Sequence, residues 1–232
     1  GRFVVILLGF ITILFLLLAM GRKMKGKTRV GKFLVRYHEY FAYIFLLVAC
    51  VHMALSLKLL EMRYMTTYAT GVGALLLGVA LWIDCIKTKR SKENRVGFRL
   101  RHLVIALIIM AFTVAHIGVT VLSLKMYQKH VSEITFSNID LSKVQNGVYR
   151  GEYDVGYIYA EVEVTVKDGK FTDIEIIDHE TEKGEKAEMI TEEMFATQSI
   201  EVDAISGATN SSLVIRKAVE EAIIKGCKQT NH

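Results

Sequence analysis

The sequence predicts a membrane α-helical bundle of four transmembrane helices followed by a small extracytoplasmic α+β domain. Hydrophobic residues make up 52% of the 232 residues, and they gather in long stretches in the first half of the chain. Charge is also divided: residues 1–140 carry 19 Lys and Arg against 6 Asp and Glu, whereas residues 141–232 carry 10 against 18. A basic, hydrophobic half joined to an acidic, polar half indicates a membrane module followed by a water-soluble domain.

Four apolar stretches approach the roughly 20 residues that an α-helix needs to cross a bilayer. We expect helices at Phe3–Met20, Tyr40–Leu60, Thr67–Ile86 and Leu103–Leu124. The first stretch is long for a signal peptide, lacks a convincing cleavage site and runs straight into a basic segment, so we expect a membrane anchor. Glycines in the third stretch indicate close packing between helices; they are Gly71, Gly73 and Gly78.

Lysine and arginine in the loops predict the orientation of the bundle. Segments 21–36 and 87–101 hold seven Lys and Arg each. The connections on the other side hold four, namely Lys58, Arg63, Lys125 and Lys129. Because basic loops stay on the cytoplasmic side, we expect a multi-pass protein of the prokaryotic cell (inner) membrane, with both termini and the polar domain extracytoplasmic. The pI near 9 then reflects charge that flanks the membrane, and we expect no nucleic-acid partner.

Four of the seven histidines fall in the second and fourth stretches at one repeated spacing. His38 and His52 are 14 residues apart, and so are His102 and His116. Fourteen residues advance an α-helix by roughly 21 Å and return to within about 40° of the starting face. Each helix therefore shows two imidazoles on one side at two depths. The two helices run in the same direction, so His38 can face His102 while His52 faces His116.

Imidazole is an axial ligand of haem iron, and two facing pairs would hold two b-type haems stacked across the membrane. Arg36 and Arg101 lie beside the inner pair, where they would meet haem propionates. The alternative is that these histidines only form hydrogen bonds between helices. The histidine spacing over residues 30–125 resembles the di-haem transmembrane core of ferric reductase-like and NADPH-oxidase-like proteins. That resemblance implies electron transfer across the membrane.

The polar half begins with a connector at residues 126–146 and continues as an outer domain at residues 147–232, so that residues 1–125 form the membrane domain. EVEVTV and FTDIEII alternate apolar and polar residues about a KDGK turn, which predicts a β-hairpin. AEMITEEMFAT (187–197) predicts a short helix. SLVIRKAVEEAIIKG (212–226) predicts an amphipathic helix that Gly226 terminates.

The segment VDAISGATNSS (202–212) precedes this last helix and has two interpretations. Gly207 and Ala208 allow a ligand to approach the backbone, and a helix that begins near Asn210 points its N–H groups at a phosphate. Thr209 would then be esterified to that phosphate. Ser, Thr and Asn also begin helices routinely as capping residues. The motif alone leaves both interpretations open.

The run from Asp203 through Ser206, Gly207 and Ala208 to Thr209 resembles the flavinylation motif of FMN-binding domains. Such domains occur in the FMN-carrying subunits of sodium-translocating NADH:quinone reductase and Rnf complexes. The resemblance spans residues 147–226 and includes GVYRGEY, VKDGK and HETEKGEK. It implies FMN joined to Thr209 by a phosphoester bond that a flavin transferase makes, with Asp203 serving recognition by the transferase. It also places residues near the isoalloxazine, namely Glu180, Thr181 and Gly184. Glu182 and Lys183 stand where the family often has Pro-Gly.

These features together predict an electron-transfer protein of the lipid bilayer. Electrons would pass from a cytoplasmic or quinol donor through the two haems to FMN on Thr209, and on to an extracytoplasmic acceptor. Two alternatives are a quinol-linked reductase that acts on a small external substrate at the flavin, and a membrane redox sensor or assembly subunit. The cysteines form no CxxC pair, which argues against iron–sulfur, c-type haem or zinc sites. We expect surface roles for His130 and His179.

Overall fold

The computed structural model describes residues 2–21, 28–59, 65–90, 95–181 and 184–228. The chain divides into two compact units, Gly1–Leu122 and Ser123–His232. The boundary falls within the fourth helix. Arg63, which contributes to the predicted orientation, and the pair Glu182 and Lys183 lie outside the described residues.

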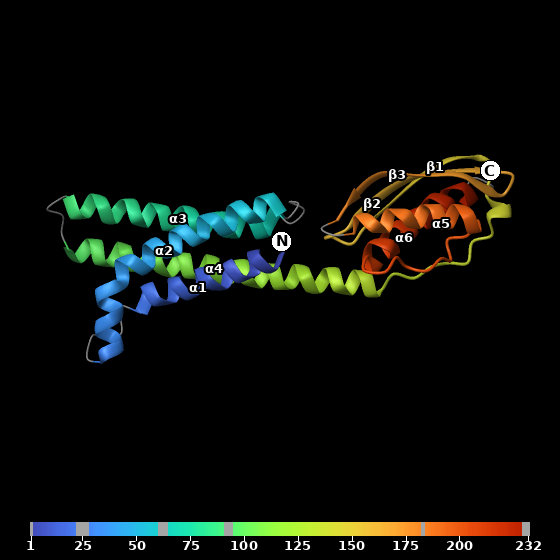
Figure 1. The fold of residues 1–232 in the computed structure, drawn as a ribbon. Coiled ribbons are helices and arrows are strands. Elements are labelled where there is room, and N and C mark those ends of the chain that lie inside the picture. Colours follow the sequence, from blue (N-terminus) through green and yellow to red (C-terminus); the bar gives the residue numbers. More distant parts are fainter. Residues whose placement is uncertain (1, 22–27, 60–64, 91–94, 182–183, 229–232) are drawn as a thin grey trace. The chain divides into compact units, whose positions relative to one another are not determined.

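Four helices carry the apolar stretches of the chain (Figure 1). They are α1 (Arg2–Met20), α2 (Arg29–Leu59), α3 (Met65–Arg90) and α4 (Arg95–Ser132). All four are long and apolar enough to cross a membrane, as the sequence predicts. However, α2 and α4 begin well before Tyr40 and Leu103, because the basic segments ahead of these residues are helical. Lys and Arg are good helix formers, and their long side chains let a helix continue past the apolar boundary.

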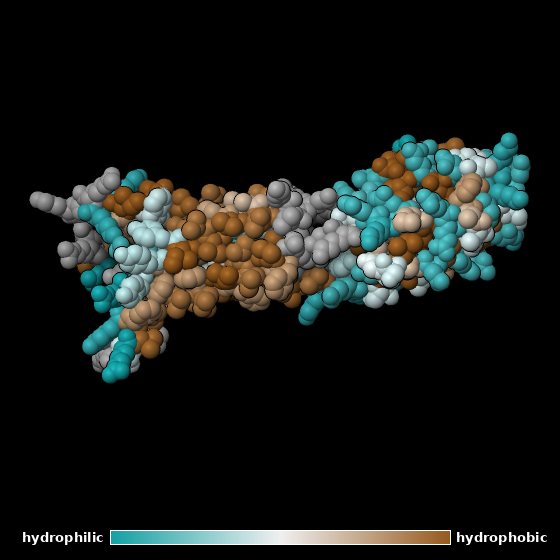
Figure 2. Space-filling view, in the orientation of Figure 1, coloured by the Kyte–Doolittle hydropathy of each residue, from teal (hydrophilic) through white to brown (hydrophobic). Residues whose placement is uncertain are grey.

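The first unit exposes its apolar side chains instead of burying them. Leu16, Phe45 and Ile109 form a small buried cluster between α1, α2 and α4. Most of the remaining large apolar side chains are exposed; Phe3 and Leu47, for example, are 76% and 65% exposed. Hydrophobic residues cover the middle of the visible face of this unit, and hydrophilic residues lie at one end (Figure 2). An apolar surface of this extent is what a helical bundle presents to lipid.

The glycines of α3 permit close packing, as the sequence predicts. A Cβ atom on Gly73 would lie 2.5 Å from Cε1 of Phe112 on α4, and one on Gly78 would lie 2.9 Å from Cδ2 of Leu46 on α2. A side chain at either position would force these neighbouring side chains to shift. Small residues at such contacts are typical of helix association in membranes.

The second unit contains an antiparallel three-stranded sheet in the order β1 (Gly147–Asp154), β2 (Tyr159–Lys167) and β3 (Lys170–Glu180). The predicted hairpin is β2–β3. Asp168 and Gly169 form its turn with φ angles of 52° and 72°, and two consecutive positive φ values match the right-handed twist of hairpin strands.

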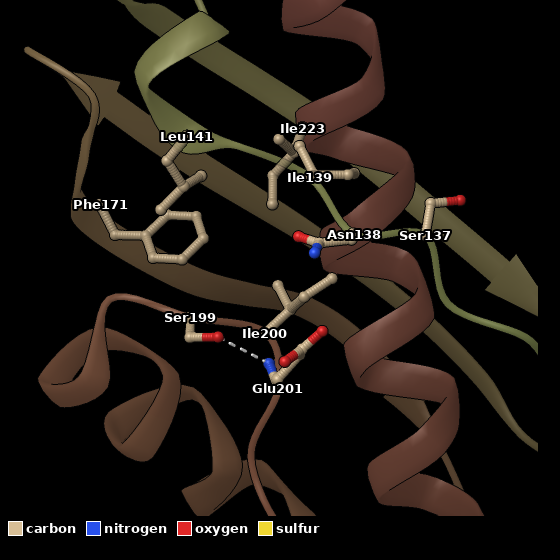
Figure 3. A pocket seen from close by; sticks show the side chains of 9 residues that line it. All are labelled: Ser137, Asn138, Ile139, Leu141, Phe171, Ser199, Ile200, Glu201 and Ile223. Atoms are coloured by element: carbon tan, nitrogen blue, oxygen red, sulfur yellow. Dashed lines mark hydrogen bonds between the residues drawn. The ribbon is translucent and has the colours of Figure 1, made fainter.

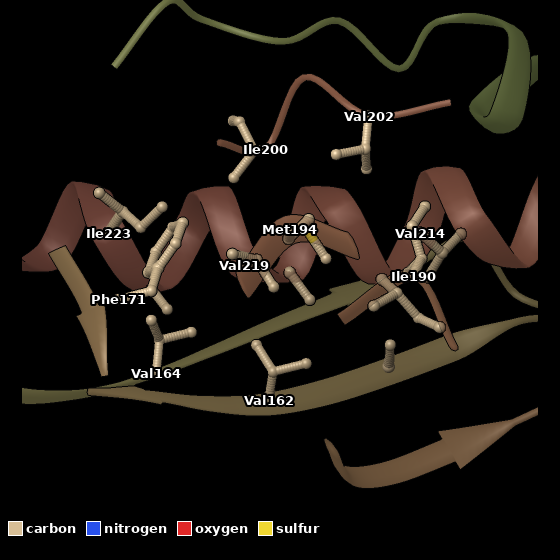
Figure 4. Close-up of a cluster of buried hydrophobic side chains, with 14 of the residues drawn as sticks. Val162, Val164, Phe171, Ile190, Met194, Ile200, Val202, Val214, Val219 and Ile223 are labelled. Carbon is tan, nitrogen blue, oxygen red and sulfur yellow. The ribbon is translucent and has the colours of Figure 1, made fainter. Parts of the chain in front are cut away.

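One face of the sheet packs against helices (Figures 1 and 4). These are the predicted short helix, present as a 3-10 turn η3 (Glu185–Met189) followed by α5 (Ile190–Thr197), and the long helix α6 (Thr209–Lys228). The core residues of β2 alternate with partly exposed ones and are almost fully buried, namely Ala160, Val162, Val164 and Val166. A Cβ on Gly151 of β1 would collide with the backbone of α6 at Ala218, so strand and helix lie in direct contact there.

The prediction that Gly226 terminates the last helix is wrong. Helix α6 continues through Gly226 to Lys228. A Cβ atom at this position would lie 2.6 Å from Cγ1 of Val144 and 2.8 Å from Cζ of Tyr149. Gly226 is therefore the point where α6 passes close to the chain segment that leads into β1, and close packing explains the glycine.

The predicted connector packs against the core of the second unit. Tyr127, Val131, Ile134, Phe136 and Ile139 contact it. Glu220 of α6 is completely buried; its carboxylate accepts hydrogen bonds from the backbone N–H of Ser137 and from Nζ of Lys217. Lys217 also donates to the carbonyl of Thr135 at 3.0 Å. A buried carboxylate thus ties the connector to α6.

We expect Glu220→Ala to loosen this attachment. The change leaves the N–H of Ser137 and the ammonium of Lys217 without their buried acceptor, which costs about 2–4 kcal/mol. Hydrogen–deuterium exchange of the full chain should show faster exchange over residues 134–139 and a lower free energy of unfolding of the second unit. Glu221→Ala, at a neighbouring carboxylate that is 40% exposed, is the control. Equal exchange in both variants would contradict the assignment.

Candidate functional site

The segment before α6 forms a tight turn that presents the start of this helix. Gly207 has a φ of 80°, and the space where its Cβ would lie is open. The N–H of Ala208 donates to the carbonyl of Ile205 at 3.0 Å. The hydroxyl of Ser212, inside the helix, accepts from the N–H of Ile205 at 3.0 Å. The turn is therefore fixed from inside the helix, while Ser206 and Gly207 stay exposed.

The four side chains of the first turn of α6 have four different environments. Asn210 donates from Nδ2 to the hydroxyl of Tyr127 at 2.8 Å. The Ser211 hydroxyl lies 3.1 Å from the hydroxyl of Thr181, and Ser212 binds the preceding turn. Thr209 is exposed, and its hydroxyl makes no hydrogen bond to any residue that the structure describes.

These four environments bear on whether residues 202–212 form a helix cap or a phosphate site. A capping residue accepts a hydrogen bond from the second or third N–H of its helix, yet no side chain of a described residue does this for α6. The first N–H groups of α6 thus have no side-chain acceptor among the described residues. A helix start of this kind favours an anion such as phosphate, and the residues present fit the phosphate of FMN.

Thr181 and Gly184 close one side of the first turn. The Thr181 hydroxyl accepts from the N–H of Gly184 at 3.0 Å and bonds Ser211. A Cβ at Gly184 would collide with the hydroxyls of both Ser211 and Thr181. The end of β3 and the start of η3 therefore lie directly against the first turn of α6. The structure thus brings these two predicted site residues into contact with Ser211, which is two residues after Thr209 in the sequence.

Two tyrosines lie near Asn210, and no local pattern in the sequence selects them. The ring of Tyr127 is 5.2 Å from the ring of Tyr157, measured between centroids, with the planes at 82°. Tyr127 comes from the last turns of α4, and Tyr157 follows Gly156 in the turn between β1 and β2. Both rings are partly exposed. They meet through a tertiary contact that no local pattern encodes.

The remaining residues predicted for the flavin site differ in burial. Asp203 is exposed, Ala208 is buried, and Glu180 is intermediate. Glu180 pairs in the sheet with Tyr159. Burial raises the pKa of Tyr159 to about 12, helped by its hydrogen bond to the carboxylate of Glu152, so this phenol stays protonated at neutral pH.

His179 is not a surface residue, and the prediction was wrong. Its side chain is only 2% exposed, and Nδ1 lies 3.0 Å from Oε1 of Glu188. Nε2 is buried with no hydrogen-bond partner among the described residues. The reason is its register opposite the buried Ala160 at the end of β2, which turns the imidazole toward the helices. His130 is exposed.

A cavity of about 90 Å³ lies elsewhere in the second unit (Figure 3). It is bounded by the connector and by the segment after α5, with residues Ser137, Asn138, Ile139, Leu141, Phe171, Ser199, Ile200, Glu201 and Ile223. Ile223 is 14 residues beyond Thr209 on α6, which corresponds to about 21 Å along the helix axis. The cavity is therefore separate from the start of α6.

The predicted histidine pairs face each other in the first unit. The rings of His38 and His102 are 5.9 Å apart between centroids, and those of His52 and His116 are 6.3 Å apart. The structure thus brings α2 and α4 together with the expected register. Among the described residues, no group of three or more His, Cys, Asp or Glu is placed to hold a metal ion.

Each of the four imidazoles uses Nδ1 for a contact with a neighbouring helix. Nδ1 of His38 lies 2.7 Å from the carbonyl of Ala19, and that of His52 lies 2.9 Å from the carbonyl of Val5, both on α1. Nδ1 of His116 lies 2.9 Å from the carbonyl of Thr67, and that of His102 lies 3.5 Å from Sγ of Cys85, both on α3. The contacts fix the ring orientations.

Glycines make room for the two rings of the second pair. A Cβ on Gly9 would lie 3.4 Å from Cε1 of His52, and one on Gly71 would lie 3.1 Å from Cε1 of His116. Each glycine follows by four residues the carbonyl that its histidine contacts, Val5 and Thr67 respectively. The same local arrangement therefore seats both imidazoles.

The predicted propionate partners have other contacts. Nη2 of Arg101 lies 3.2 Å from Oδ1 of Asp84. The guanidinium of Arg36 lies 5.7 Å from the centroid of the neighbouring Tyr37 ring. Both arginines remain close to the inner histidine pair in the sequence, because Arg36 is two residues before His38 and Arg101 directly precedes His102.

We expect Gly184→Ala to destabilise the second unit by about 1–3 kcal/mol through overpacking. Gly184 has a φ of −93°, which alanine tolerates, so the cost is steric. The free energy of unfolding, measured by hydrogen exchange of the slowest core amides, should fall. Adding Ser211→Ala removes the first atom that the new Cβ meets and should restore part of the loss. A double variant no more stable than Gly184→Ala would contradict this contact.

Comparison with known proteins identifies one family. The family model described as FMN-binding domain matches residues 156–224. This range begins in the turn between β1 and β2, includes Thr181, Gly184 and Thr209, and ends in α6. No curated protein and no solved structure matches the chain. Over residues 156–224, the second unit is therefore similar to the FMN-binding domain family.

Proposed function

We propose that this protein carries electrons across a membrane, with FMN esterified to Thr209 and two b-type haems bound by His38 with His102 and by His52 with His116. One observation carries the proposal. Within the segment similar to FMN-binding domains, Thr209 is exposed and its hydroxyl has no hydrogen bond to any described residue, while the side chains of the next three residues all have hydrogen-bond partners.

The start of α6 supports attachment of the flavin at Thr209. The N–H groups of the first turn would bind the phosphate, and the open space beside Gly207 leaves the backbone accessible to it. Asp203, exposed ahead of the turn, would serve recognition by a flavin transferase. FMN, when bound, accepts and releases electrons one or two at a time. The chain contributes its position and its local field.

The geometry of the histidine pairs supports haem binding. Two imidazoles that share one metal through bonds of about 2 Å place their ring centroids roughly 6 Å apart, close to both distances found here. Metal-bound histidines generally use the other ring nitrogen for a hydrogen bond that fixes the ring. All four Nδ1 atoms have such a contact, so Nε2 is the atom that would bind iron. Arg36 and Arg101 would serve propionates.

Basic residues support the proposed orientation. The ends of the bundle that hold Arg36 and Arg101 also hold most of the Lys and Arg of the first half, and such ends stay in the cytoplasm. The FMN-binding unit would then be extracytoplasmic. The proposed donor is a quinol or a cytoplasmic reductant, and the proposed acceptor is extracytoplasmic.

We expect Thr209→Ala to abolish flavinylation. When the protein is produced together with a flavin transferase, the intact mass of the parent should exceed the polypeptide mass by one FMN less one water, because the ester forms with loss of water. The variant should have the bare polypeptide mass. Thr197→Ala, at another exposed threonine, should keep the full increase. An FMN increase that survives in Thr209→Ala would disprove the attachment site.

We expect His52→Ala/His116→Ala to lose one of two haems. Removal of both axial ligands leaves the iron of that site without protein bonds. The haem content per chain, measured from the absorption spectrum of the reduced pyridine complex, should fall by half. His130→Ala, at an exposed histidine on the same helix α4, is the control. Unchanged haem content in the double variant, or a parent without haem, would refute the ligand assignment.

A further inference from the structure

Two tyrosines flank the proposed flavin attachment site. The hydroxyl of Tyr127 accepts from Nδ2 of Asn210 at 2.8 Å, and Asn210 directly follows Thr209. The Tyr157 ring stands edge-on to Tyr127 at 5.2 Å. We name this pair, Tyr127 and Tyr157, the aromatic wall. Both rings are only partly buried, so the wall presents apolar surface at the edge of the domain.

Tyr127 lies outside the residues that match the FMN-binding domain family. It belongs to the last part of α4, which packs against the core of the second unit together with Val131 and Ile134. The bond to Asn210 holds its ring against the first turn of α6. The chain therefore adds to the start of α6 an aromatic side chain that the matched segment does not contain.

The surroundings of the first turn of α6 differ between the side of Ser211 and the side of Asn210. On the side of Ser211, Thr181 and Gly184 pack so closely that a single Cβ at Gly184 would collide with the Ser211 hydroxyl. On the side of Asn210, the neighbouring surface consists of two half-exposed aromatic rings. The second side therefore offers a matching surface to a flat aromatic group tethered at Thr209, since aromatic rings favour edge-to-face and offset-stacked contacts.

We propose that the isoalloxazine ring of FMN packs against the aromatic wall formed by Tyr127 and Tyr157. This inference rests on the proposed esterification of Thr209. The end of α4 then completes the flavin site, and Tyr127 acts as a positioning residue held by Asn210. The hydroxyl bond fixes the tyrosine, and the ring face is the surface offered to the flavin.

Fluorescence of the attached flavin tests the wall, because a phenol in contact with an isoalloxazine shortens its excited-state lifetime. The full chain, flavinylated by a transferase and purified in detergent, is compared with Tyr127→Phe and Tyr157→Phe. Phenylalanine keeps an aromatic ring at each position and removes the electron-rich phenol; at position 127 it also removes the hydrogen bond to Asn210. We expect the flavin lifetime to lengthen severalfold in at least one variant, with intact mass showing that the flavin is still attached.

Tyr149→Phe is the matched control. The Tyr149 hydroxyl also has one hydrogen bond, to the carbonyl of Gln145 at 2.9 Å, but its ring lies against Gly226, about 25 Å from Thr209 along α6. The flavin lifetime of Tyr149→Phe should equal that of the parent. Equal flavin lifetimes in the parent and all variants would overturn the aromatic wall but not the flavinylation of Thr209. A lifetime that lengthens equally in Tyr149→Phe would also overturn the aromatic wall. A parent without attached FMN overturns the proposed function and this inference together.

Discussion

The packing of α6 against the sheet is the constraint on which the second unit depends. Buried residues of α6 face the valines of β2, and Gly151 lets β1 approach the helix backbone. Glu220 and Lys217 hold the connector on another side of the same helix. Because α6 is fixed along its length, the position of its first turn is fixed too, and the surroundings of Thr209 follow from the core.

The first unit depends on a different constraint, the need of polar groups for partners among apolar side chains. An imidazole without a hydrogen bond in an apolar environment is costly. Here each of the four rings has a contact through Nδ1 with a helix next to its own. The carbonyls used on α1 are Val5 and Ala19, which repeat the 14-residue spacing of His38 and His52. The 14-residue spacing of His38 and His52 on α2 is thus matched by the spacing of the two carbonyls on α1 that they contact.

Local patterns in the sequence predict much of this structure. Hydropathy predicts the four long helices, alternation about Asp168 and Gly169 predicts the hairpin, and histidine spacing predicts which rings face each other. Each depends on a short-range period that the backbone geometry imposes. Hydropathy predicts later starts for α2 and α4 than the structure has, because charged residues lower the hydropathy of a segment although they form helices readily.

Contacts between distant segments escape such patterns. Gly226 resembles a helix end in sequence, but Val144 and Tyr149 determine its role. The burial of His179 depends on strand register, and the contact of Tyr127 with Asn210 joins residues 83 positions apart. For the start of α6, the sequence allowed both a cap and a ligand site. The partners of Asn210, Ser211 and Ser212 are tertiary contacts that the sequence does not show, and among the described residues none of these side chains caps α6.

The isolation of the Thr209 hydroxyl has a consequence for maturation. If FMN is esterified to Thr209 as proposed, the modifying enzyme would break no hydrogen bond between this hydroxyl and a described residue, and the prosthetic group could be added after the polypeptide has acquired its tertiary structure. The unmodified chain would then be a stable precursor, and the supply of the transferase would determine when it receives its flavin.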